Sequence, residues 1–101
     1  MAYSLAQLQQ LIAATYDVKD RRRGVEGTFM WFLEEVGELA ASLRGRNTLA
    51  QSEEFADVLA WLATLANIAG IDLDKAVQAK YGLGCPGCKQ VPCICDDKEK
   101  P

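Results

Sequence analysis

The stretch EVGELAASLRGRNTLAQSEEFAD, residues 35–57, decides the fold because it carries two acidic pairs on either side of one short turn. Glu35 and Glu38 end one apolar helical stretch, and Glu54 and Asp57 open the next. Arg46 is the middle of the stretch, and Glu38 and Glu54 are each eight residues from it. Glu35 and Asp57 are each eleven residues from it. Members of a pair spaced i, i+3 share one helix face. In an antiparallel helical hairpin the four carboxylates therefore lie at two matching heights.

Helical signals extend outward from this hairpin in both directions. A capping box at residues 4–7 starts the chain's first apolar stripe, and glycines stand where three of the stripes stop. The sequence predicts four helices: from Ser4 to about Arg22, from near Thr28 to Gly45, from a second capping box beginning at Thr48 to Gly70, and a short one from Asp72 through Lys80. No strand-like alternation is present, so we expect an all-α fold.

The predicted third helix has no charged outer face. Residues 58–71 contain no charged residue, and a helix of this kind is buried on several sides. A domain within 101 residues has difficulty burying one helix completely. We therefore expect part of this helix, with Trp61 and Ile68, to pack against another subunit; a central helix wrapped by its own chain is the alternative.

Composition narrows the possible functions. The chain has no histidine, which excludes Ser-His-Asp and Cys-His catalysis and His-ligated zinc. Its net charge is −3, which argues against a module that coats nucleic acid. No apolar run reaches the length of a membrane span and no signal peptide is visible, so we expect a cytoplasmic protein that binds neither membranes nor nucleic acid polymers.

The acidic pairs are better explained by a metal ion than by solvation. Glu54 and Asp57 begin the helix that lacks a charged face, and residues 24–57 offer only two cations, both arginines, as salt-bridge partners. Converging carboxylates repel one another unless a cation holds them, and oxygen ligands suit Mg²⁺ or Mn²⁺. Such ions most often serve phosphate chemistry, in which a further carboxylate, here Glu34, takes a proton from the attacking water. Trp31 shares a helix face with Glu35. An aromatic side chain in this position indicates either one wall of a ligand site or a contact with another subunit.

The motif residues resemble a known family. Residues 34–40, EEVGELA, followed by residues 54–59, EFADVL, are similar to the E-E-x-x-E and E-x-x-D motifs of MazG-type all-α nucleoside triphosphate pyrophosphohydrolases. Residues 70–77 with the lysine at position 80 resemble the C-terminal helix of that family. The resemblance implies a MazG-like domain over residues 1–82, assembled as a homodimer or homotetramer. It also implies cleavage of a (d)NTP to a (d)NMP and pyrophosphate.

The resemblance also implies roles for individual residues. The four motif acids become Mg²⁺ ligands, and Glu34 with Glu35 becomes the catalytic pair that orients or deprotonates the water. A lysine near the phosphates corresponds to Lys80. Candidates for the base and sugar pocket are Trp31, Trp61 and Asn67. The alternative for the two tryptophans is a place in the core or in a subunit interface, and the alternative for Asn67 is that it caps a helix end.

The C-terminal segment, residues 83–101, is a separate cysteine-rich tail. Its four cysteines are the only ones in the chain: Cys85, Cys88, Cys93 and Cys95. The tail lacks an apolar core, so either a metal or covalent bonds order it, or it stays disordered. Four thiolates fit a closed structural zinc site, while two disulfides or free, redox-active thiols are alternatives.

Two functions from different classes remain open at this point. The first is a Mg²⁺-dependent nucleotide pyrophosphohydrolase; a related alternative is a metal-dependent phosphatase that releases inorganic phosphate. The second is a non-catalytic helical interaction module with a zinc-binding tail. The complete acidic set favours the enzyme.

Overall fold

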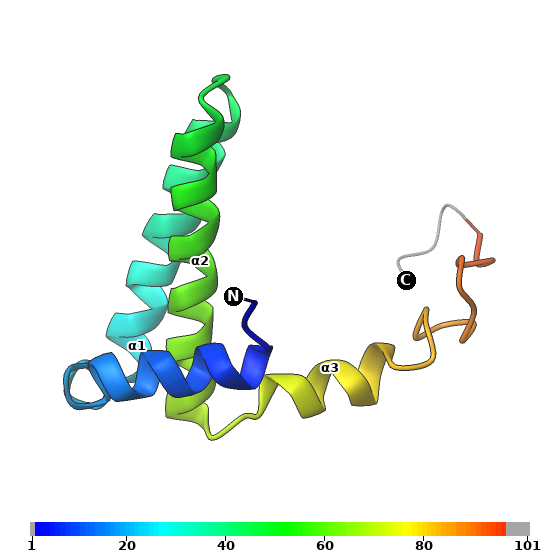
Figure 1. Cartoon of the computed structure of the whole chain (residues 1–101), viewed down its shortest axis with the longest axis horizontal. Coiled ribbons are helices and arrows are strands. Elements are labelled where there is room, and N and C mark those ends of the chain that lie inside the picture. The colour runs from blue at the N-terminus through cyan, green and yellow to red at the C-terminus, as the bar shows by residue number, and fades with distance from the viewer. Residues whose placement is uncertain (1, 97–101) are drawn as a thin grey trace.

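The structure, a computed structural model, describes residues 2–96, and all regular structure in that range is helical. It contains α1 (Leu5–Leu43), α2 (Thr48–Ala69) and α3 (Leu73–Tyr81). Helix α1 is bent at Gly24 into two arms (Figure 1). The second arm and α2 form an upright antiparallel hairpin, and the first arm crosses the foot of that hairpin (Figure 1). Helix α3 leads away from the hairpin toward the cysteine-rich tail.

The break at Gly24 was expected, and its cause is the backbone. Gly24 has φ 81° and ψ 176°, and a positive φ of this size favours glycine because it has no Cβ. The two predicted helices on either side are one bent element, since the second arm starts directly after Gly24 rather than near Thr28. Residues 2–96 therefore contain three helices. The predicted number was four, which is reached only if the two arms of α1 are counted as separate helices.

Helix caps fix the other boundaries. The predicted capping box at Ser4 is present, with both of its hydrogen bonds. The predicted cap at Thr48 is wrong: Asn47 is the N-cap of α2 and accepts from the Ala50 amide at 3.0 Å. Gly70 ends α2 in the left-handed conformation, and Asp72 caps α3, both as expected.

A side-chain network joins the three helices at the foot of the hairpin. The Gln9 amide donates to the Asn67 side chain at 3.1 Å and to the Ile71 carbonyl at 2.8 Å, and it accepts from the Leu73 amide at 2.8 Å. Asp74 of α3 accepts from the Ala6 amide in the first turn of α1. These bonds hold α3 against the N-terminal arm.

The single chain buries little apolar surface. Its buried apolar side chains in the described range are Ile12, Ala63 and Ala66. Large apolar side chains along the hairpin stay at least two-fifths exposed, among them Phe29, Leu33, Phe55, Leu59 and Leu62. Exposed apolar surface of this extent is typical of interaction sites and ligand-binding grooves.

No single helix within residues 2–96 combines the length and apolar character that a membrane span needs, whereas α2 and α3 taken together, with 97° between them, meet those criteria as a bent pair.

Candidate active site and cysteine cluster

Two pairs of acids face each other across the hairpin. Glu35 and Glu38 come from the second arm of α1, and Glu54 and Asp57 come from the first turns of α2. Carboxylate oxygens of Glu35, Glu38 and Glu54 all lie within 4.8 Å of one another. Asp57 is not in that group and lines the adjacent cavity instead. The structure therefore brings three of the four predicted ligands together and leaves the fourth beside them.

The acidic group lacks the partners that buried carboxylates require. The Oε2 atoms of Glu35 and Glu54 are buried and have no hydrogen-bond partner among the described residues. Burial, together with the charges of Glu38, Asp57 and Glu54, raises the pKa of Glu35. Burial and the charges of Glu38 and Asp57 likewise raise the pKa of Glu54. Two unpartnered oxygens from facing helices are the arrangement that a divalent cation stabilises.

Each of the two tryptophans lies about one helical turn from one of these acids, Trp31 from Glu35 and Trp61 from Asp57. Trp31 precedes Glu35 by four residues and Trp61 follows Asp57 by four, so each ring lies on the same helix face as its acid. Across the hairpin the rings stack, with centroids 6.1 Å apart and planes inclined by 13°. The guanidinium of Arg23 lies 4.8 Å from the centroid of the Trp61 ring. An aromatic platform beside a carboxylate group suits a heterocyclic base next to a triphosphate.

A cavity of about 320 Å³ opens between the first arm of α1 and α2. Its polar lining combines both signs of charge: Lys19 and Arg23 against Asp20 and Asp57. The remaining lining residues are Ile12, Tyr16, Ala60, Trp61 and Thr64. The cavity thus lies between Trp61 of the aromatic platform and Asp57, the acid that is not in the close group.

A buried network orients Arg23 at this cavity. Asp20, only 4% exposed, accepts from Arg23 Nη1 at 3.1 Å and from the Thr64 hydroxyl at 3.1 Å. Arg23 also donates to the Thr28 hydroxyl at 3.3 Å. Sequence reasoning assigned no specific role to Arg23, Asp20 or Thr64. The available signal was the i, i+3 spacing of Asp20 and Arg23 immediately before Gly24.

The other predicted site residues are not part of the close acidic group. Glu34 is exposed and borders a shallow hollow with Trp31. Both ends of the Asn67 amide are engaged by Gln9, at a position ten residues along α2 from Asp57, or about 15 Å. Lys80 is in the last turn of α3, where its ammonium lies 5.6 Å from the Tyr81 ring. The roles expected for Glu34, Asn67 and Lys80 stay predictions.

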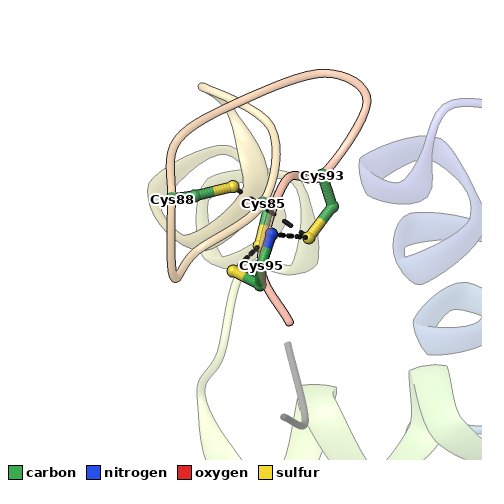
Figure 2. Close-up of side chains that lie close together, drawn as sticks. All are labelled: Cys85, Cys88, Cys93 and Cys95. Atoms are coloured by element: carbon green, nitrogen blue, oxygen red, sulfur yellow. Dashed lines mark hydrogen bonds between the residues drawn. The ribbon is translucent and has the colours of Figure 1, made fainter. Parts of the chain in front are cut away.

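The four cysteines form a second group beyond α3. Their Sγ atoms all lie within 4.8 Å of one another, and the side chains converge from two neighbouring segments (Figure 2). All four are free thiols, with Cys85 and Cys95 at 3.8 Å and Cys88 and Cys93 at 4.0 Å between sulfurs. This group can hold a metal ion.

The thiols of the group differ in acidity. The backbone amide of Ile94 lowers the pKa of Cys88 to about 6. The thiols of Cys93 and Cys85 raise the pKa of Cys95 to about 12. The first thiolate therefore forms readily, whereas the last one requires a cation nearby.

Comparison with known proteins assigns the family. Residues 23–82 match the MazG nucleotide pyrophosphohydrolase domain. The chain is 39% identical over 83 residues to a dATP/dGTP diphosphohydrolase of Cyanophage S-2L. The aligned residues make up 82% of this chain and 75% of the phage protein. The chain belongs to the MazG family and is a nucleoside triphosphate pyrophosphohydrolase. The predictions of family, all-helical fold and enzyme class are confirmed.

Some predictions lie beyond these comparisons. The match ends at residue 82, next to the last helical residue, Tyr81. The division into a domain over residues 1–82 and a tail over residues 83–101 stays a prediction, and residues 97–101 of that tail lie outside the described part of the chain.

Proposed function

We propose that this protein converts a nucleoside triphosphate to a nucleoside monophosphate and pyrophosphate, with Mg²⁺ (or Mn²⁺) held by Glu35, Glu38, Glu54 and Asp57. The observation that carries the proposal is the pair of buried carboxylate oxygens of Glu35 and Glu54 that lack partners. A third ligand oxygen, from Glu38, lies within 4.8 Å of both acids. An all-oxygen donor set of this kind suits Mg²⁺ or Mn²⁺ rather than zinc.

The chain's own residues supply the other parts of the reaction. Mg²⁺, when bound, offsets the negative charge of the phosphate oxygens. Glu34 stands next to Glu35 in an exposed position and accepts the proton of the attacking water. Arg23 and Lys19 line the cavity beside Asp57 and attract the polyphosphate.

The base occupies the aromatic side of the site. Trp31 and Trp61 offer stacked rings next to the acids, and Arg23 packs on Trp61. Because the similar phage protein is a dATP/dGTP diphosphohydrolase, dATP and dGTP are the first substrates to test. Lys80 lies on α3, apart from the acids of the same chain, so in this proposal it contacts a nucleotide bound across a subunit boundary, whereas the Asn67 amide is already engaged by Gln9.

The functional form is a homodimer or a homotetramer. Support comes from the exposed apolar row on α2, Phe55, Leu59 and Leu62, which shares one helix face by its i, i+4, i+7 spacing. A second copy that covers this row also gives the uncharged part of α2 a buried environment. Zinc at the four cysteines is a further cofactor that we propose, and it takes no part in hydrolysis.

A product assay tests the proposal directly. The purified protein is incubated with a panel of ribo- and deoxynucleoside triphosphates and Mg²⁺, and pyrophosphate and inorganic phosphate are measured separately. We expect equal amounts of monophosphate and pyrophosphate, and no turnover in EDTA. Release of inorganic phosphate with a diphosphate would instead identify the phosphatase alternative. No turnover of any nucleotide, with no rise in melting temperature on adding Mg²⁺ and a nonhydrolysable triphosphate, would favour the interaction module.

A further inference from the structure

Residues 84–95 fold around the four thiols without an apolar core. Leu83, Val91 and Ile94 are 73%, 82% and 75% exposed, so the large apolar side chains of this segment point to solvent. The backbone nevertheless turns back on itself, with the Lys89 amide donating to the Cys85 carbonyl at 2.6 Å and the Cys85 amide to the Gln90 carbonyl at 3.1 Å. Something at the centre of the loop must offset the entropy lost in ordering it.

The spacing of the sulfurs discriminates between a metal ion and disulfides. Zinc–sulfur bonds of about 2.3 Å in a tetrahedron place neighbouring sulfurs about 3.8 Å apart. The Cys85–Cys95 and Cys88–Cys93 sulfur distances are 3.8 Å and 4.0 Å, and all four sulfurs lie within 4.8 Å of one another. Two disulfides would need sulfurs about 2.05 Å apart within each pair. The observed group is one cluster around a common centre rather than two pairs.

The backbone around the sulfurs favours thiolates. The Ile94 amide donates to Cys88 Sγ at 3.5 Å. The Cys95 amide donates to Cys93 Sγ at 3.3 Å, as Figure 2 shows. Hydrogen bonds to the charged form of a group stabilise that form. Gly87 gives the sulfurs room, because a Cβ at this position would lie 3.2 Å from Cys95 Sγ. The loop therefore presents four sulfur ligands and leaves no open position for a substrate.

From these observations we infer that Cys85, Cys88, Cys93 and Cys95 bind one Zn²⁺ as a closed tetrathiolate site, and that this ion folds residues 84–95 as a knuckle independent of the hydrolytic site. Binding requires the loss of the thiol protons, and the ion then carries the folding free energy of the loop. The Gly84 amide of the knuckle donates to the Tyr81 carbonyl at the end of α3. The helix caps and the Gln9 network contain no residue of the knuckle, so in this inference helices α1–α3 fold without the ion.

Metal analysis of the full-length protein, purified without chelator, tests the site. We expect one zinc per chain by native mass spectrometry, no zinc in Cys85→Ser or Cys95→Ser, and full zinc in Glu38→Gln. With Co²⁺ in place of zinc, thiolate-to-cobalt charge-transfer bands should appear. Iron in place of zinc, a mass lower by four hydrogen atoms because two disulfides have formed, or four free thiols without metal would each overturn the inference.

Proteolysis tests the folding role separately. Removing zinc with a chelator should accelerate tryptic cleavage after Lys89 about tenfold or more, while the helical circular dichroism stays unchanged. Loss of helical signal, or unchanged cleavage, would contradict an independent metal-folded knuckle. Hydrolysis is measured on the same samples after the chelator is removed and Mg²⁺ is restored: zinc loss with intact hydrolysis supports this inference, and absent hydrolysis with bound zinc counts against the proposed activity alone.

Two backbone variants leave all four ligands in place. Gly84 has φ 102°, and a Cβ there would lie 2.7 Å from the Gln90 carbonyl oxygen, so Gly84→Ala should weaken zinc binding at least about tenfold. Lys89 also has a positive φ, 60°, and Lys89→Gly should retain or strengthen zinc binding. Equal zinc affinity in both variants would show that the observed loop is not the metal-bound one.

Discussion

Trp31 and Trp61 stack across the hairpin at the same distance along the chain from their neighbouring acids. Trp31 is four residues before Glu35, and Trp61 is four residues after Asp57, so the symmetry of the acids extends to the aromatic rings. The chain contains two tryptophans, and both are in this stack. One helical hairpin therefore carries both an aromatic platform and a group of carboxylates, which are the two surfaces that a nucleoside triphosphate requires.

This arrangement makes tryptophan fluorescence a direct probe of binding. Adding Mg²⁺ and a nonhydrolysable triphosphate should change the emission, because every emitting ring lies beside the proposed site. Trp31→Ala and Trp61→Ala should each raise KM about two- to tenfold, the range that one aromatic contact supplies. Tyr81→Phe, on α3, is the control and should leave KM unchanged. A KM equal to that of the wild type in both tryptophan variants would remove the platform from the binding site.

Neutral replacements of the acids should separate catalysis from stability. Asp57→Asn and Glu38→Gln should lower kcat/KM by at least about 100-fold, because each removes a proposed ion ligand. The metal-free variants should melt no lower than the wild type, since the change relieves repulsion within the acidic group. Glu53→Gln is the matched control, because Glu53 is exposed and adjacent to Glu54. Retained activity in Asp57→Asn and Glu38→Gln would disprove the ligand assignment.

The metal-free protein should lose stability as pH rises toward neutrality. The pKa values of Glu35 and Glu54 are raised in the folded state above their ordinary value of 4.5. Folded protein then retains protons that the unfolded chain releases. This contribution is fully present below the unfolded pKa and is lost as pH rises through the folded pKa. Thermal melts between about pH 5 and pH 7 should show the decline, which Glu35→Gln combined with Glu54→Gln should reduce and Mg²⁺ should offset. The same slope in the double variant would assign it to other groups.

Two neighbouring arginines provide a matched test of burial. Arg23 pairs with Asp20, whose side chain is 6% exposed, and Arg21 pairs with Asp17, whose side chain is 42% exposed. Arg23→Ala leaves a buried carboxylate without its cation and should cost about 1–3 kcal/mol in the free energy of unfolding. Arg21→Ala should cost about 0.5 kcal/mol or less. Denaturant titration measures both, and equal costs would contradict the buried network around Asp20.

The exposed apolar row on α2 should hold subunits together. Leu59→Glu places a charge in the middle of this row and should shift the protein toward monomers in size-exclusion chromatography with light scattering. Leu49→Glu is the control, because Leu49 is 70% exposed and lies off the row. A wild-type protein that is monomeric at micromolar concentration would contradict the proposed assembly.

The sequence predicted those features that depend on local chemistry. The end of a helix at Gly24 could be predicted, because glycine accepts a backbone conformation that few other residues adopt. The proximity of the acids could be predicted, because their spacing is symmetric about one turn. The cap of α2 was misplaced by one residue, since Asn47 and Thr48 are both good capping residues and only the backbone decides between them.

Features that depend on how the arms pack were not predictable. Asp20 and Thr64 are 44 residues apart and meet only because the bend at Gly24 brings the first arm of α1 against α2. The bond between the Asn67 and Gln9 side chains, 58 residues apart, depends on the same packing. No periodicity in a single helix contains this information.

Gln9 has a practical consequence for anyone who handles this protein. Its side chain bonds Asn67, Ile71 and Leu73, so the corner between α2 and α3 is latched by a residue near the start of α1. A variant without the first ten residues would lose these hydrogen bonds. Helix α3 and the cysteine knuckle that follows it would then no longer be held in one orientation. Crystallisation trials should therefore shorten the protein from the other end.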